Sequence, residues 1–253
     1  MAEAPQDPLA HNGYQRLLQA GHHAYDQGDF VAAQQWYQKA AVASPGEEAP
    51  YFNQGNCLMA LQQPEAALQA YRQALQLNPG RAKTYNNIGL VYKQLQNWDE
   101  ARLWYQRALA TDASYYPAYN NLGNLHQTLG EHSEAERWYY RCLELDPLHL
   151  NARFNLACLY RDTAQLAAAA LLFQQIVAQD PDHAPAWCEL GLLALDAGSV
   201  QEAQACWVLA LKADESHVPT LINLARLMKS HSRPAAADAL YARVQAWGGQ
   251  TAN

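Results

Sequence analysis

An all-α solenoid of seven helical hairpins is the fold class that the sequence predicts, and three series of residues at a spacing of 34 predict it. The first series holds a small residue: Gly21, Gly55, Gly89, Gly123, Ala157, Gly191 and Ala225. The second, twelve residues further on, holds Ala33, Ala67, Ala101, Ala135, Ala169, Ala203 and Ala237. The third, four residues later, is always aromatic: Tyr37, Tyr71, Tyr105, Tyr139, Phe173, Trp207 and Tyr241. No insertion interrupts the series.

The first helix of each unit is predicted by bulky and small residues at helical spacing. In the third unit Tyr85, Ile88, Gly89 and Tyr92 form one such stripe. The chain then breaks between the two helices, at Asn97 in this unit and at glycine in the equivalent region of two others.

The second helix presents Ala101, Tyr105 and Ala108 on one face. Helix axes about 8–10 Å apart leave no room for a branched side chain at the crossing point, so a small residue is expected there with the aromatic ring filling the gap. Proline at the end of a unit stops the second helix before the next unit begins. Such prolines close four units, at Pro45, Pro79, Pro147 and Pro181.

This pattern resembles the tetratricopeptide repeat (TPR) family. The W-x2-L-G-x2-Y pattern of that family is nearest in Trp187, Leu190 and Gly191. The resemblance places a tail at residues 1–13 and seven repeats at 14–47, 48–81, 82–115, 116–149, 150–183, 184–217 and 218–251. It implies a right-handed superhelix whose first helices line a concave groove, and stability that comes from stacking of neighbouring repeats.

Composition and charge exclude several classes of protein. The net charge of -7 disfavours a nucleic-acid partner, which needs an excess of Lys and Arg facing the phosphates. The longest apolar run, residues 166–173, is far below the roughly 20 residues that cross a bilayer, so no membrane insertion is expected. The first twelve residues do not form a secretory signal, and five cysteines without a CxxC pair fit reduced thiols. These observations predict a cytoplasmic protein.

No catalytic motif is present, because the sequence contains no HExxH, GxSxG, Walker loop or GxGxxG. We therefore expect no enzyme activity, no cofactor and no metal ion. His149, His183 and His217 recur at the spacing of 34 just before a first helix, which predicts a capping or turn role for them.

A series of amides is the main candidate for function. Two residues before the small residue of each unit stand Gln19, Asn53, Asn87, Asn121, Asn155, Glu189 and Asn223. Asparagine is a mediocre helix former, and its amide can pair with both the C=O and the N–H groups of an extended peptide. The series is similar to the asparagine ladder in the repeats of O-linked N-acetylglucosamine transferase. We interpret it, with Asn86, Asn120 and Asn124, as a peptide-binding surface; the alternative is that the amides bridge adjacent helices.

Charge is uneven along the array. Residues 72–161 hold 10 basic and 8 acidic residues, whereas both flanking segments are net acidic. Lys83, Lys93 and Arg161 are expected to face the groove there, together with Phe154. Tyr25, Phe52 and Met59 are expected to make its N-terminal end apolar. A peptide that combines acidic groups with an apolar anchor fits this pattern.

The sequence thus predicts a non-enzymatic scaffold or adaptor that binds an extended peptide segment of a partner protein. One alternative is the substrate-recognition arm of a larger enzyme such as a glycosyltransferase, and a second is an RNA-binding solenoid. The last helix has no successor to cover its stacking face, and its stripe of Leu240, Val244 and Trp247 predicts self-association through the C-terminal repeat.

Overall fold

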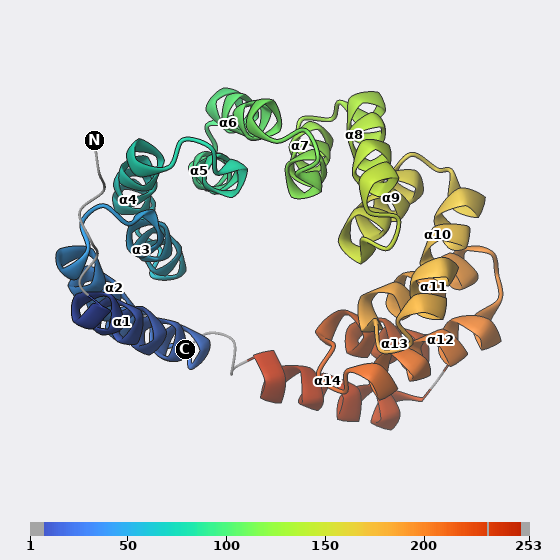
Figure 1. Ribbon diagram of the computed structural model, residues 1–253. Helices are drawn as coiled ribbons and strands as arrows, with labels where there is room; N and C mark the ends of the chain where they lie inside the picture. Colours follow the sequence, from blue (N-terminus) through green and yellow to red (C-terminus); the bar gives the residue numbers. More distant parts are fainter. Residues whose placement is uncertain (1–7, 232, 249–253) are drawn as a thin grey trace. The chain divides into compact units, whose positions relative to one another are not determined.

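The computed structural model describes residues 8–231 and 233–248, and this part of the chain folds into fourteen α helices (Figure 1). The helices are α1 (Pro8–Asp26), α2 (Phe30–Ala43), α3 (Glu48–Ala60), α4 (Pro64–Leu77), α5 (Ala82–Gln94), α6 (Trp98–Thr111), α7 (Tyr116–Thr128), α8 (His132–Leu145), α9 (Leu150–Asp162), α10 (Leu166–Gln179), α11 (Ala184–Asp196), α12 (Val200–Ala213), α13 (Val218–Ser230) and α14 (Pro234–Gly248). The odd-numbered helices are called first helices below, and the even-numbered ones second helices.

Each predicted repeat contains one pair of helices. From α3 onward the first helices begin at the residue where a predicted repeat begins, for example Glu48, Ala82 and Tyr116. At the N-terminal end, α1 begins at Pro8 and so extends into the predicted tail 1–13. The side chain of Trp247, one of three residues in the predicted C-terminal stripe, lies outside the part of the chain that the structure describes.

The helices form two compact units, which divide between Leu145 and Asp146. In unit 1, which holds α1 to α8, each first helix packs against the second helix of its own hairpin and α5 also contacts α7. Figure 1 shows α3, α5 and α7 on one side of this unit and α4, α6 and α8 on the other. Unit 2 holds α9 to α14 and repeats the same hairpin packing.

In the five hairpins that have glycine at this position, the core is an aromatic ring of the second helix packed on that glycine of the first. A Cβ atom added to Gly123 would lie 2.5 Å from Cε1 of Tyr139, and one added to Gly191 would lie 2.3 Å from Nε1 of Trp207. The predicted small residues Ala101 and Ala135 are fully buried. The crossing points therefore have the close approach that the repeat predicts.

In six hairpins, the turn between the two helices contains one residue whose backbone has a positive φ, and these residues are again 34 positions apart. Gly28, Gly130 and Gly198 hold it in three hairpins, and Gln62, Gln96 and Ala164 hold it in the other three that show it. Asn97, predicted to break the chain, instead caps α6, because its Oδ1 accepts the backbone N–H of Glu100. The break itself lies one residue earlier, at Gln96.

The predicted capping role of the three recurrent histidines is confirmed for two of them. His149 Nδ1 accepts the backbone N–H of Ala152, and His183 Nδ1 accepts that of Ala186. His217 precedes α13 in the same way, but its Nδ1 lies 2.7 Å from the hydroxyl of Thr220.

His217 should make the stability of the protein depend on pH. Burial lowers the pKa of its imidazole below the ordinary value of about 6.5, an effect that Asp214 and Glu189 partly oppose. The unfolded chain therefore binds a proton more readily, and this contribution to the free energy of unfolding is present above about pH 6.5 and lost as the pH falls below it. Thermal melting between pH 7.5 and 5.5 should show this loss in the wild type and a smaller loss in His217→Asn, which can cap without titrating. An equal loss in both would contradict the assignment.

No helix in the described part of the chain is long and apolar enough to cross a membrane. All five cysteines are free thiols, as expected from their spacing.

Candidate functional site

The amide series in unit 1 forms hydrogen bonds between neighbouring first helices. The Nδ2 group of Asn87 on α5 donates to Oδ1 of Asn56 on α3 at 3.0 Å, and the same oxygen accepts the hydroxyl of the core residue Tyr71 at 2.8 Å. Asn53 Nδ2 lies 3.2 Å from His22 Nε2 on α1. The bridging role that the sequence left open is therefore present at Asn53 and Asn87.

The next step of the series joins α7 to α5. Asn121 donates from Nδ2 to Oδ1 of Asn86 at 2.8 Å. Asn86 is only 4% exposed, so this predicted peptide-binding residue lies beneath the surface, where it orients Asn121. Asn124 on α7 accepts the hydroxyl of Tyr139 at 2.7 Å, and Asn120 is half-buried on the same helix. The amides thus tie the first helices to one another and to the core tyrosines.

A pocket of about 290 Å³ opens on this face of unit 1. Its polar wall is formed by Asn56, Asn87 and Tyr71, and its apolar wall by side chains of three first helices. The apolar residues are Tyr25, Met59, Ala60 and Leu90. Tyr25 and Met59 are therefore where the sequence predicts them, whereas Phe52 is 2% exposed and belongs to the core.

The same pocket recurs in unit 2, four repeats later. It measures about 410 Å³, and Leu192, Leu195, Trp207, Asn223 and Arg226 stand there at the positions of Asn56, Met59, Tyr71, Asn87 and Leu90. The amide in this pocket, Asn223, is again a member of the amide series. Its Nδ2 lies 3.6 Å from Sγ of Cys188 on α11. The pocket therefore occurs at equivalent repeat positions in both units.

The predicted basic residues of unit 1 have different environments. Lys83 is exposed at the start of α5, and its ammonium group lies 5.4 Å from the centre of the Phe52 ring. Lys93, near the end of α5, is half-buried and has no carboxylate partner among the described residues. Burial lowers the pKa of Lys93, because the charged ammonium is partly removed from water.

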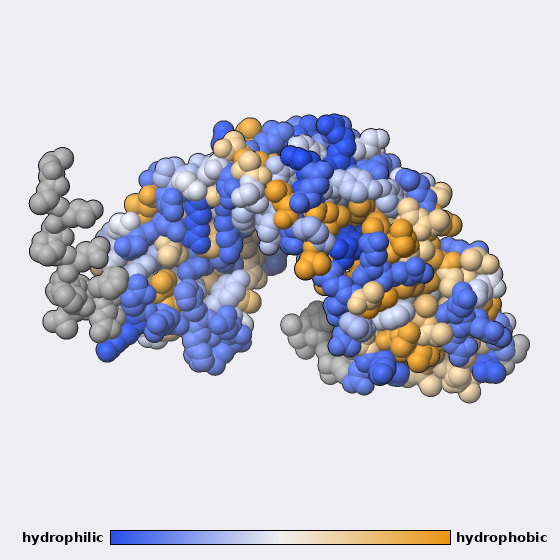
Figure 2. All heavy atoms as spheres, turned by 45° about the vertical axis from the view of Figure 1, so that its right-hand side comes forward, coloured by the Kyte–Doolittle hydropathy of each residue, from blue (hydrophilic) through white to orange (hydrophobic). Residues whose placement is uncertain are grey.

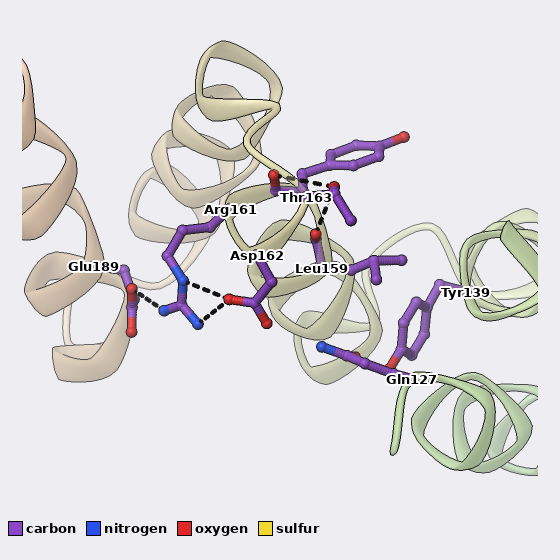
Figure 3. A network of polar contacts seen from close by, with 8 residues as sticks. Gln127, Tyr139, Leu159, Arg161, Asp162, Thr163 and Glu189 are labelled. Carbon is purple, nitrogen blue, oxygen red and sulfur yellow. Dashed lines mark hydrogen bonds and ion pairs between the residues drawn. The ribbon is translucent and has the colours of Figure 1, made fainter. Parts of the chain in front are cut away.

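Arg161 in unit 2 is already neutralised by two carboxylates. Its guanidinium donates to Glu189 on α11 and to Asp162 beside it on α9, the latter at 2.8 Å from Nη2 (Figure 3). Glu189 is the acidic interruption of the amide series, so this ion pair takes the place of an amide bridge between first helices. Phe154 packs edge-on against Phe173 at 5.5 Å, and Asn155 is half-buried on the same helix.

Sequence reasoning missed Asn56 and Arg226. Asn56 is not a member of the series at two residues before glycine, but it lies three residues after Asn53 and so shares the face of that member. Arg226 stands three residues after Asn223, is exposed and makes no ion pair with a described residue. Reading the helix face at a spacing of three residues from each member would have found both.

Comparisons with known proteins agree with this geometry. Models described as tetratricopeptide repeat match residues 46–114, 116–148 and 154–215. The chain belongs to the tetratricopeptide repeat family. No curated protein matches the chain in sequence.

Solved structures, two of them of TPR proteins, share the fold. A TPR protein from Parabacteroides merdae is 18% identical, with 94% of each chain covered and a TM-score of 0.71. PilW, a type IV pilus biogenesis factor, is 23% identical over 85% of this chain and 96% of its own, with a TM-score of 0.70. YrrB, a TPR protein with an unusual peptide-binding site, is 25% identical over 73% of this chain and 95% of its own, with a TM-score of 0.53.

The described residues contain no group of three His, Cys, Asp or Glu side chains that could hold a metal ion. The candidate site is built from amides, apolar side chains and a few cations.

Proposed function

We propose that this TPR protein is an interaction scaffold that binds an extended peptide segment of a partner protein. The binding surface is the face formed by the odd-numbered helices, which carries the amide series and is called the first-helix face below. The observation that carries the proposal is the recurrent pocket, which in both units combines an asparagine of the amide series with apolar side chains of neighbouring first helices. An amide beside an apolar hollow suits a peptide, because it pairs with the backbone while the hollow takes a side chain. The similarity to YrrB, itself a peptide-binding TPR protein, supports this choice.

The hydrogen bonds among the amides are compatible with ligand binding. An amide has two donor hydrogens and an acceptor oxygen. Asn87 directs its Nδ2 group to Asn56 at 3.0 Å and to Tyr71 at 3.5 Å, whereas its Oδ1 accepts only one long contact, of 3.5 Å, from Asn86. The oxygen is therefore the group that can accept a backbone N–H of a peptide. The bonds between helices then fix the direction of each amide before the ligand arrives, which lowers the entropy lost on binding.

The preferred ligand of unit 1 carries an acidic group. Lys93 lies three residues after Leu90, which lines the pocket, and a carboxylate bound nearby would stabilise its partly desolvated ammonium group. In unit 2 the exposed guanidinium of Arg226 stands beside Leu192 and Leu195 and favours the same combination of acid and apolar anchor.

The test begins with peptides selected on the purified wild-type protein from a random display library. Their affinity should fall about threefold to tenfold in Asn87→Ala, the range expected for one hydrogen bond, while the fold persists because Ala favours helix. Gln106→Ala, an exposed amide on the second helix α6, is the matched control and should bind as the wild type does.

The charged part of the proposal has its own readout. Lys93→Gln should weaken the binding of the selected acidic peptides. It should also reduce the loss of affinity between low salt and 0.5 M salt. Unchanged affinity in both Asn87→Ala and Lys93→Gln would leave the amides of this face with a purely structural role and would remove the proposed function.

A further inference from the structure

A second groove, on a different face of unit 2, is lined by α10, α11 and α12. It measures about 680 Å³ and is largely apolar. Its residues are Ala170, Gln174, Val177, Ala178, Trp187, Leu190, Leu193, Ala194, Glu202 and Cys206. None of them lines the pocket described above, although α11 contributes to both. In Figure 2, which brings the helices of unit 2 forward, apolar residues in orange gather over this part of the molecule.

The equivalent space in unit 1 is filled by the protein's own tryptophan. Trp104 on α6 stacks between Tyr85 and Tyr92 of α5, with ring centres 5.9 and 6.4 Å away. Its indole N–H donates to Glu100 Oε2 at 3.0 Å. The next hairpin repeats the aromatic packing with Trp138 but not the hydrogen bond, because Trp138 Nε1 has no hydrogen-bond partner among the described residues and Glu134, at the position of Glu100, pairs with Arg137.

Trp138 on α8 lies against two rings of α7 that stand at the same repeat positions. Its ring centre is 5.9 Å from that of Tyr119 and 6.2 Å from that of His126. Two consecutive hairpins therefore use an indole held by aromatic rings to close this space.

Unit 2 has lost the tryptophan and one of the two rings that hold it, and has kept an aromatic residue and a carboxylate at the other two positions. Cys206 stands at the position of Trp104, and Ala194 at the position of Tyr92. Trp187 replaces Tyr85 as the aromatic wall, and Glu202 stands where Glu100 accepts the indole N–H. Across the groove, Ala170 and Val177 of α10 replace the larger Leu68 and Leu75 of α4. The groove is therefore open because smaller residues stand at four equivalent positions.

The charge around the groove also favours a ligand that carries a hydrogen-bond donor. Glu202 is exposed and makes no hydrogen bond or ion pair with a described residue, and α10 carries no charged side chain over its 14 residues. The Cys206 thiol lies near this carboxylate: burial raises the pKa of Cys206, and Glu202 raises it further. A free carboxylate beside an apolar hollow with a Trp wall complements a flat apolar ring that carries one N–H group.

We propose that this groove binds a tryptophan side chain of a partner protein, seated against Trp187 with its indole N–H donated to Glu202. The partner's ring takes the place that Trp104 and Trp138 occupy in their own hairpins. The groove lies apart from the pockets of the first-helix face, so this inference does not rest on the peptide-binding proposal.

The test uses N-acetyl-L-tryptophanamide as the probe and the wild-type protein labelled with 15N. Saturable shifts should appear at the backbone amides of Ala178, Ala194 and Cys206. The analogue methylated on the indole nitrogen should bind about threefold to tenfold more weakly, because it has lost one charge-assisted hydrogen bond. This difference should disappear in Glu202→Ala and persist in Gln204→Ala, an exposed neighbour on the same helix.

A blocking variant gives an independent readout. Cys206→Trp should fill the groove from within and abolish the shifts, with helical content unchanged in circular dichroism. The proposal is overturned if these amides do not respond, if both probes bind the wild type equally, or if folded Cys206→Trp still responds. A wild-type dimer in sedimentation velocity that becomes monomeric in Cys206→Trp would identify the occupant as a second copy and would also overturn it.

Discussion

Trp207→Ala should lower the free energy of unfolding by about 3–5 kcal/mol, the largest effect that we expect from a single substitution. The ring is fully buried against the main chain of Gly191, and its indole N–H donates to the carbonyl of Cys188 at 3.1 Å. Removing it leaves a cavity that the hairpin cannot close, because the first helix already stands as near as its glycine allows.

Urea titration followed by far-ultraviolet circular dichroism measures this loss. The neighbouring residue supplies the control, since Val208 is 54% exposed on the same helix and Val208→Ala should change stability by no more than about 0.5 kcal/mol. Comparable losses in the two variants would show that Trp207 is not the core residue of its hairpin.

Gly123→Ala should destabilise the protein by about 1–2 kcal/mol, although alanine is the better helix former. The added Cβ would lie 2.5 Å from Cε1 of Tyr139, closer than van der Waals contact allows. The ring cannot move aside freely, because its hydroxyl is within 2.7 Å of the side-chain oxygens of Asn124 and Gln127. Overpacking against a fixed ring therefore outweighs the gain in helix propensity.

The fifth hairpin suggests the decisive control. There Ala157 occupies the glycine position and Phe173 the aromatic position; both are fully buried, and Phe173 has no hydroxyl to hold its ring. The loss caused by Gly123→Ala should accordingly be smaller in a Tyr139→Phe background, whereas Gly46→Ala, in open space, should be close to neutral. Equal losses in both backgrounds would show that the hydroxyl does not fix the ring.

The sequence predicts the hairpins well because their cores depend on contacts within one repeat. A glycine on the first helix and an aromatic residue sixteen positions later meet in every hairpin that has them, so their spacing alone identifies the crossing point. The capping histidines follow for the same reason, since His149 bonds a backbone N–H only three residues away. Local contacts at a fixed register leave a direct trace in the sequence.

The candidate site is less predictable because it depends on contacts between repeats. The sequence places Asn86 beside Asn87 with no sign that only Asn87 reaches the surface. The ion pair of Arg161 with Glu189 joins residues 28 positions apart, so a side chain predicted to be a free cation is neutralised. The open groove of unit 2 could have been predicted from the small residues Ala194 and Cys206. This prediction requires comparing each position with its equivalents in the other repeats.

The location of a bound peptide tests the central claim most directly. A selected peptide should be titrated into the 15N-labelled wild-type protein while the side-chain NH2 signals of Asn56, Asn87 and Asn223 are followed. Peptide binding on the first-helix face predicts saturable shifts of these amide signals, reduced for the remaining asparagines of unit 1 in Asn87→Ala. Shifts confined to the second helices, or to the residues of the groove at Trp187 and Cys206, would contradict it.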